Sequence, residues 1–150
     1  MAINPPRSLP ERRHDVLTRL KDDVDLWVST ADAGGVPYLV PLSFLWIDET
    51  FLIATPPTAP TARNLTAGGN VRLALGATRD VVLVEGVARP LTTAELGTMG
   101  DAYAAHTGWD PRAEGTDYQY FRIEPRRIQA WREVNELKGR DIMRDGVWID

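Results

Sequence analysis

Apolar and polar side chains alternate along several short stretches of this 150-residue chain, and this pattern restricts the fold more than any other feature. In the segment VDLWVSTA (24–31), valine and leucine alternate with aspartate, tryptophan and serine. A period of two is typical of a β-strand that buries one face. The segment DAGG (32–35) follows, and its glycines supply the positive φ angles that a hairpin turn requires. The sequence therefore predicts a fold built on short antiparallel strands.

Seven such stretches occur along the chain in meander order, and from them we expect a sheet of about six strands. The segments are 24–31, 36–47, 51–55, 71–76, 81–91, 118–125 and 127–133, with a proline separating the last two and a final hairpin turning at Asp145-Gly146. Two helices are predicted at 9–22 and 94–106, because Ser8 with Glu11 and Thr92 with Glu95 have the spacing of a capping box.

No parallel crossover unit is evident, so the strands are expected to be antiparallel throughout. Pro37 and Pro41 cannot donate ladder hydrogen bonds, which indicates an edge, a bulge or a barrel corner in that strand. Closing the sheet removes exposed strand edges. We therefore expect a mainly β (α+β) fold, a six-stranded antiparallel split β-barrel with flanking helices.

The length fits one domain spanning 1–150. Its expected parts are an N-terminal helical segment (1–23), a barrel core (24–91), a helix (92–106) and C-terminal strands (118–150). The net charge of −4 argues against a nucleic-acid binder, and the absence of cysteine excludes disulfides and thiolate metal sites. No apolar stretch approaches the length of a membrane span, and no signal peptide is recognisable, so a cytoplasmic protein is expected.

The sequence offers little chemistry of its own. His14 and His106 lie in separate predicted helices, without the close spacing of a metal pair, so no metal site is predicted. No nucleophile elbow, zinc-protease motif or P-loop is present. Glu85 lies in an apolar strand, and its side chain has two interpretations. It faces a dimer interface or a pocket, or, more simply, it pairs with an oppositely charged residue at the rim of the barrel. No catalytic residue can be assigned, so any chemistry is expected to come from a bound cofactor.

The segment ATPPTAPTARNLTAGG (54–69) is the best candidate for holding such a group. Thr58 can cap a short helix whose first turn accepts Pro60 and which ends at Gly68-Gly69. The N-terminus of a helix attracts anions, and threonine hydroxyls and Arg63 add donors for a phosphate. Read by itself, the segment fits an ordinary capped connection slightly better than a binding site.

The order of the segments resembles the pyridoxamine 5′-phosphate oxidase-like family of split β-barrels. The resemblance rests on GGVPYLVPLSFLW, FLIAT, PTARNL, NVRLALG and VVLVEGVARPL, which occur in this order between 25 and 91, and on the later FRIEPRRIQAW. Members of this family bind FMN or the deazaflavin F420. The resemblance therefore implies an FMN or F420 cofactor and a homodimer with two cofactors in grooves between the subunits.

The resemblance also assigns roles to individual positions. It implies that five residues form the phosphate loop, that two flank the cofactor ring, and that two near the end of the chain reach the partner's cofactor. The phosphate-loop residues are Thr55, Thr58, Thr61, Arg63 and Asn64. The residues that flank the ring are Ser43 and Phe44, and those that reach the partner's cofactor are Trp131 and Arg132. Many relatives have a lysine where this chain has Thr61, which leaves open whether FMN, F420 or neither binds. No histidine follows Ile123, so oxidation of pyridoxamine phosphate itself is not expected.

Three functional hypotheses follow. The first is an FMN- or F420-dependent oxidoreductase that transfers a hydride to or from a small conjugated substrate. The second is a dimeric barrel that stores or senses a flavin, F420 or another aromatic ligand without turnover, and the third is a barrel that serves only in dimeric interaction. Several aromatic residues either line the substrate pocket or belong to the core: Trp27, Trp46, Trp109 and Tyr120.

Overall fold

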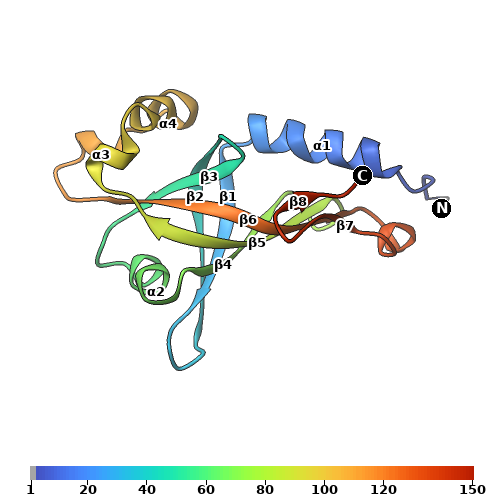
Figure 1. The fold of residues 1–150 in the computed structure, drawn as a ribbon, viewed down its shortest axis with the longest axis horizontal. Coiled ribbons are helices and arrows are strands. Elements are labelled where there is room, and N and C mark those ends of the chain that lie inside the picture. Colours follow the sequence, from blue (N-terminus) through green and yellow to red (C-terminus); the bar gives the residue numbers. More distant parts are fainter. Residues whose placement is uncertain (1–2) are drawn as a thin grey trace.

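Six antiparallel strands close into a barrel in the computed structural model, which describes residues 3–150 (Figure 1). The strands are β1 (Asp25–Ala31), β2 (Pro37–Ile47), β3 (Thr50–Thr55), β4 (Asn70–Leu75), β5 (Val81–Pro90), β6 (Gln119–Trp131), β7 (Asp141–Arg144) and β8 (Val147–Trp148). The helices are α1 (Leu9–Asp22), α2 (Pro60–Gly68), α3 (Thr93–Leu96) and α4 (Met99–Thr107), with 3₁₀ turns η1 (Pro111–Ala113) and η2 (Val134–Glu136). The predicted fold class is confirmed.

The sheet order is β3-β2-β1-β4-β5-β6-β7-β8, and β3 also pairs with β6, which closes the barrel. The first part of β6 pairs with β3 and closes the barrel, whereas its last part pairs with β7. The C-terminal part of β6 therefore extends beyond the closed barrel. The short β7–β8 hairpin turns at Asp145 and Gly146, which both have positive φ angles, as predicted. This extension and α1 lie at one end of the molecule, whereas α2 and α3 lie at the other (Figure 1).

The prediction of two strands divided at Pro125 was wrong, because β6 continues through it. Gly86 faces Pro125 and Glu85 faces Arg127, so one extra residue, Arg126, forms a bulge in β6. A bulge accommodates the missing proline N–H without ending the strand. Gly86 has no side chain to obstruct this close approach, since an added Cβ would lie 2.8 Å from Ile123 Cγ2.

The capping boxes at Ser8 and Thr92 are both present, and α1 ends where the sequence predicts. The single helix predicted over 94–106 is instead two helices, α3 and α4. Gly97, with φ 49° and ψ −133°, ends α3 in a conformation that a helix cannot contain. Leu96 and Tyr103 nevertheless face inward, as expected.

The β1–β2 hairpin projects from the barrel (Figure 1). The first half of β2 pairs only with β1, and β3 joins β2 from Phe44 onward. Pro37 and Pro41 therefore lie on a free strand edge, which confirms the first of the three positions expected for them.

Two apolar clusters stabilise the fold. The larger fills the barrel and includes Phe44, Phe51 and Phe121, each fully buried. The smaller lies between the sheet and the α3–α4 region and includes Leu52, Tyr103 and Tyr120. No helix within residues 3–150 is long and apolar enough to cross a membrane.

Candidate functional site

The chain leaves the barrel at Thr55, the last residue of β3, and enters α2 at Pro60. Thr55 is buried and pairs with Gln119 of β6. The N-cap of α2 is Ala59, which makes no side-chain cap hydrogen bond, so the prediction that Thr58 caps this helix was wrong. Thr58 is exposed in the preceding turn, where Ala59 N donates to Pro56 O at 3.0 Å. Gly69 ends α2 in the left-handed conformation, as predicted.

Thr61, in the first turn of α2, carries an unusual hydroxyl group. Its side chain is 1% exposed, and Oγ1 has no hydrogen-bond partner among the described residues. Arg63 N donates to Ala59 O at 3.1 Å, so the N–H groups of Thr61 and Ala62 precede the first bond of the helix. A buried hydroxyl without a partner is destabilising by about 1–3 kcal/mol, which makes this position a candidate ligand contact.

The two polar residues that follow in α2 face different surroundings: Arg63 faces solvent, and Asn64 faces the barrel. Arg63 is exposed, and no ion pair or hydrogen bond of its side chain occurs within residues 3–150. Asn64 is half-buried, and its Nδ2 donates to Thr30 Oγ1 of β1 at 3.0 Å. Asn64 therefore anchors α2 to the barrel in this structure. Sequence reasoning missed Thr30, because nothing in the chain indicates that β1 lies beneath α2.

The two residues expected beside a cofactor ring differ in environment. Phe44 is fully buried, and its ring centroid lies 5.8 Å from that of Phe51, inside the barrel. Its side chain is thus part of the core. Ser43 is half-buried, donates through Oγ to Asp25 Oδ1 at 2.8 Å, and accepts through its carbonyl from the Tyr103 hydroxyl at 3.2 Å.

Trp131 and Arg132 lie at the opposite end of the molecule from α2. Thr55 pairs with the first residue of β6 and Trp131 is the last, a separation along one strand of roughly 35–40 Å. Trp131 is half-buried beneath the Arg140 guanidinium, which lies 5.6 Å from its ring centroid. Arg132 is paired with Asp80 at 3.4 Å and Asp15 at 3.7 Å. One subunit therefore does not bring these residues to its own α2.

Glu85 is held by charge partners on the outer face of the sheet. It lies 2.6 Å from Arg72 and 3.8 Å from Arg127, which matches the simpler of its two interpretations. Arg72 and Glu85, with Thr30 and Asn70, also line a hollow of about 460 Å³ that opens near the end of α2. This hollow is the cavity nearest to the Asn64–Thr30 contact.

The histidines do not form a site. His106 lies in the last turn of α4, and its Nε2 is 2.8 Å from Asp23 O, which fits a role at the helix end. No group of three or more metal-ligating side chains occurs within residues 3–150.

The first turn of α2 fits a phosphate group in part. It offers the Thr61 hydroxyl, two N–H groups outside the helical ladder and the Arg63 guanidinium nearby. Ala59 and Pro60 add no side-chain donor. The donor set suits one phosphate or phosphodiester, held with fewer charged contacts than a lysine at position 61 would allow.

The family model of pyridoxamine 5′-phosphate oxidase matches residues 16–132, which is most of the chain. The chain belongs to this family. The match covers the whole barrel from β1 to β6, including α2. The resemblance found in the sequence is thereby confirmed. No curated protein is similar enough in sequence to match the chain.

Several solved structures share this fold. A heme binding protein from Mycobacterium smegmatis has a TM-score of 0.71 at 16% identity, covering 97% of this chain and 60% of that protein. An F420 reductase has a TM-score of 0.62 at 15% identity, covering 74% of this chain and 93% of that protein. A heme storage protein from Vibrio cholerae has a TM-score of 0.62 at 18% identity, with coverages of 78% and 92%. These likenesses show the fold.

Proposed function

We propose that this member of the pyridoxamine 5′-phosphate oxidase family binds FMN or F420 through the first turn of α2 and transfers a hydride to or from a small conjugated substrate. The observation that carries the proposal is the buried, unpartnered Oγ1 of Thr61 beside the free N–H groups of the helix. In this role Thr61 and Arg63 bind the phosphate, and the buried Thr55 supports the turn. The similarity to an F420 reductase supports the choice of cofactor class.

The residues of this chain would bind and orient the cofactor, and the cofactor would supply the reactive atom. Asn64 contributes by fixing α2 on β1, which keeps the helix N-terminus in place. Of the two residues expected beside the ring, Ser43 would be the one to contact it, because the Phe44 side chain is committed to the core. The orientation of the ring against substrate would then provide most of the rate enhancement.

We further propose a homodimer formed by the outer face of β1, β2, β4 and β5. Three apolar side chains on this face are exposed, Trp27 by 48%, Leu39 by 59% and Val87 by 41%. Each of them lies on a strand that is paired with a neighbouring strand. Trp27 faces Pro41 on one side and Ala74 on the other, which makes the apolar surface continuous across three strands. Apolar surface of this kind typically marks a protein interface. A dimer would also allow Trp131 and Arg132 of one subunit to approach α2 of the other.

Cofactor titration tests the proposal. Purified protein should bind FMN or F420, followed by absorbance, fluorescence and the shift in melting temperature. Arg63→Ala should weaken the binding by about 1–3 kcal/mol, the contribution of one charged hydrogen bond, and leave the unliganded protein equally stable because the side chain is exposed. Arg79→Ala is the matched control, since that arginine is also exposed but lies in the β4–β5 turn. Equal affinities for the two variants would contradict the assigned role.

A second candidate function is storage or sensing of an aromatic ligand without turnover. Two observations favour it: the α2 N-cap provides no side-chain donor, and proteins that bind or store heme share the fold. Heme therefore belongs in the titration beside FMN and F420. A ligand that binds but is never reduced or oxidised in the presence of substrates would support this function over the first.

A further inference from the structure

A second hollow, of about 570 Å³, is lined by α3 and the residues before it, by η1 and the loop that follows it, and by the start of β6, and no residue of α2 lines it. In Figure 1 this region forms the tip of the molecule beside α3. Its size is within the range of small-molecule pockets. Tyr118 and Tyr120 line it, and the Trp109 ring contacts that of Tyr118 edge to face at 5.1 Å. The hollow therefore offers an aromatic wall to a ligand.

The two side chains with nitrogen donors that line this hollow, Gln119 and Arg112, already donate to protein acceptors. Gln119 Nε2 donates to Leu91 O at 2.9 Å and to Tyr120 O at 2.8 Å. Arg112 donates through Nε and Nη2 to Asp110 and through Nη2 to Asp101, while its Nη1 lies against Gly100. The positive charge of Arg112 is thus matched by two carboxylates.

Glu114 Oε1 accepts from Trp109 Nε1 at 2.6 Å, but three other polar groups around the hollow lack partners in the described part of the chain. The Tyr120 side chain is 6% exposed, and its hydroxyl has no hydrogen-bond partner among the described residues. Burial and the nearby Asp110 carboxylate raise the pKa of Tyr120, so the hydroxyl stays neutral. Asp117 forms no ion pair within residues 3–150, and Gln119 Oε1 accepts no hydrogen bond there. Asp117 and Gln119 Oε1 can only accept, so a ligand that satisfies them must donate hydrogen bonds, whereas the neutral Tyr120 hydroxyl can donate or accept.

We infer that this hollow binds a small organic cation, a protonated amine attached to an aromatic or apolar body. The amine would donate to Asp117, Gln119 Oε1 and the Tyr120 hydroxyl, and the body would lie against the tyrosine rings. Cations are favoured over aromatic faces, and a charged hydrogen bond to a carboxylate is among the stronger polar contacts. The site is separate from the first turn of α2, so it stands whether or not that turn binds a phosphate.

The test compares three probes of one shape by calorimetry and by tryptophan fluorescence, to which Trp109 contributes: 2-phenylethylamine, 2-phenylethanol and phenylacetate. We expect the amine to bind at least tenfold more tightly than the alcohol and the carboxylate not to bind. Asp117→Asn should reduce amine affinity about tenfold, which corresponds to one charged hydrogen bond. Glu124→Gln is the matched control, because it makes the same change of charge at an exposed carboxylate of β6 that lies outside the hollow.

Tyr120→Phe provides a second measurement. It removes a hydroxyl that has no partner, so the variant should fold with unchanged or higher stability and bind the amine more weakly than Tyr38→Phe, a control on β2. Absence of amine binding at millimolar concentration, equal binding of amine and carboxylate, or equal affinity of Asp117→Asn and Glu124→Gln would each overturn the assignment.

Discussion

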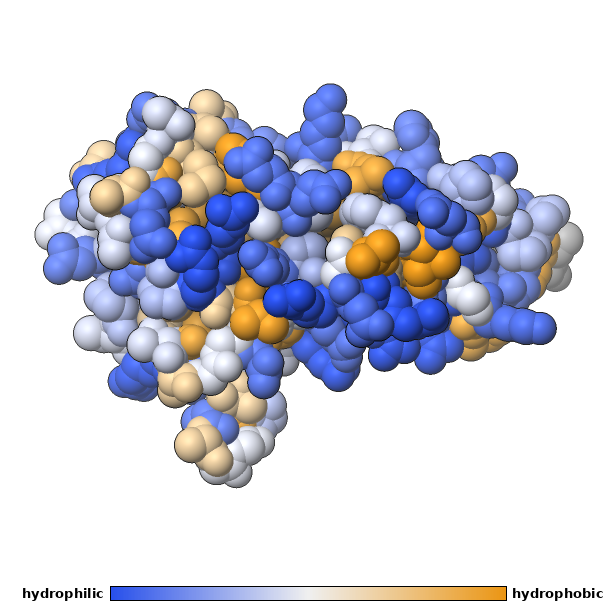
Figure 2. Space-filling model, viewed as in Figure 1, coloured by the Kyte–Doolittle hydropathy of each residue, from blue (hydrophilic) through white to orange (hydrophobic). Residues whose placement is uncertain are grey.

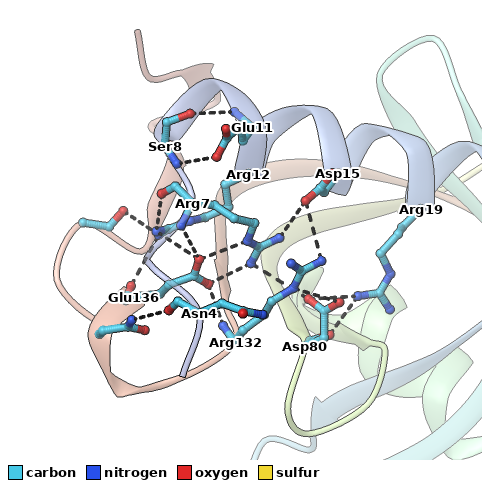
Figure 3. A network of polar contacts seen from close by, with 12 residues as sticks. Asn4, Arg7, Ser8, Glu11, Arg12, Asp15, Arg19, Asp80, Arg132 and Glu136 are labelled. Carbon is cyan, nitrogen blue, oxygen red and sulfur yellow. Dashed lines mark hydrogen bonds and ion pairs between the residues drawn. The ribbon is translucent and has the colours of Figure 1, made fainter. Parts of the chain in front are cut away.

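Arg7 and Glu136, 129 positions apart in the sequence, form a two-pronged ion pair at the end of the molecule opposite α2. Arg7 Nη2 donates to Glu136 Oε1 at 2.8 Å, and Arg7 Nε donates to Oε2 at 3.0 Å. The same carboxylate accepts the Arg7 and Arg132 backbone N–H groups, at 2.8 and 2.7 Å. Figure 3 shows it between Arg7 and Arg12, with Asp15 and Asp80 nearby. The pair thus fixes the chain before α1 onto η2 and the end of β6.

Glu136→Gln should destabilise the protein by about 3 kcal/mol at neutral pH. The Glu136 side chain is 3% exposed and that of Arg12 5%, and removing one partner of a buried pair leaves the remaining charges uncompensated. Urea unfolding measures the change. Glu124→Gln is the control, since its partner Arg126 is exposed and the effect there should stay within about 0.5 kcal/mol. A loss of similar size in both variants would contradict a special role for Glu136.

The same carboxylate predicts a pH dependence. Hydrogen bonds from Arg7, stronger than the opposing effect of burial, lower the pKa of Glu136 to about 2 from an ordinary value of 4.5. A lowered pKa gives a stability contribution that is complete above pH 4.5 and is lost as the pH falls toward 2. Wild type and Glu136→Gln should therefore differ most at neutral pH and converge near pH 2. Parallel stability curves over this range would exclude the mechanism.

Thr61→Val separates a ligand contact from a structural one. Valine keeps the shape of threonine and removes the unpartnered hydroxyl, so the unliganded protein should be equally stable or up to about 1 kcal/mol more stable. Cofactor affinity should fall about five- to tenfold. Thermal melts with and without cofactor measure both effects, and Thr66→Val, at an exposed position of the same helix, is the control. Lower stability with unchanged affinity would show that the hydroxyl serves the fold alone.

Trp27→Glu tests the proposed dimer face. A charge at the centre of that apolar surface should convert a dimer into a folded monomer, measured by sedimentation. On the face seen in Figure 2, hydrophilic residues surround several separate apolar patches. An exposed apolar residue is therefore not unusual by itself in this protein. Val134→Glu, at a 75% exposed site in η2, is therefore the necessary control and should leave the mass unchanged. A wild-type protein that sediments as a monomer would refute the dimer.

Gly86→Ala should destabilise the barrel by several kcal/mol. A Cβ at this position would lie 2.8 Å from Ile123 Cγ2 and 2.9 Å from the backbone oxygen of Glu124, which cannot move without disturbing the β5–β6 ladder. Denaturant unfolding measures the loss. Gly115→Ala, where nothing lies within 4 Å, should change stability little.

The sequence alone determined the features that depend on neighbouring residues. Alternation predicted the strands, the capping boxes at Ser8 and Thr92 predicted two helix starts, and Asp145-Gly146 predicted the last hairpin, because these signals act within a few positions. The prediction that a strand ends at Pro125 was wrong, because the outcome there depends on a residue distant in the sequence. Pro125 would end an isolated strand, but Gly86 opposite it allows a bulge, and no local pattern reports which residue lies across the sheet.

Only the tertiary structure decided the environments of the candidate site. The sequence placed Thr61 near a helix start, but its burial and its missing partner follow from packing of α2 on the barrel. The sequence also did not show that Phe44 is buried in the core or that Asn64 donates to Thr30. Nor did it show that Trp131 lies at the far end of β6 from α2. These outcomes depend on which segments meet after the barrel closes, and closure is set by the β3–β6 pairing between residues more than sixty positions apart.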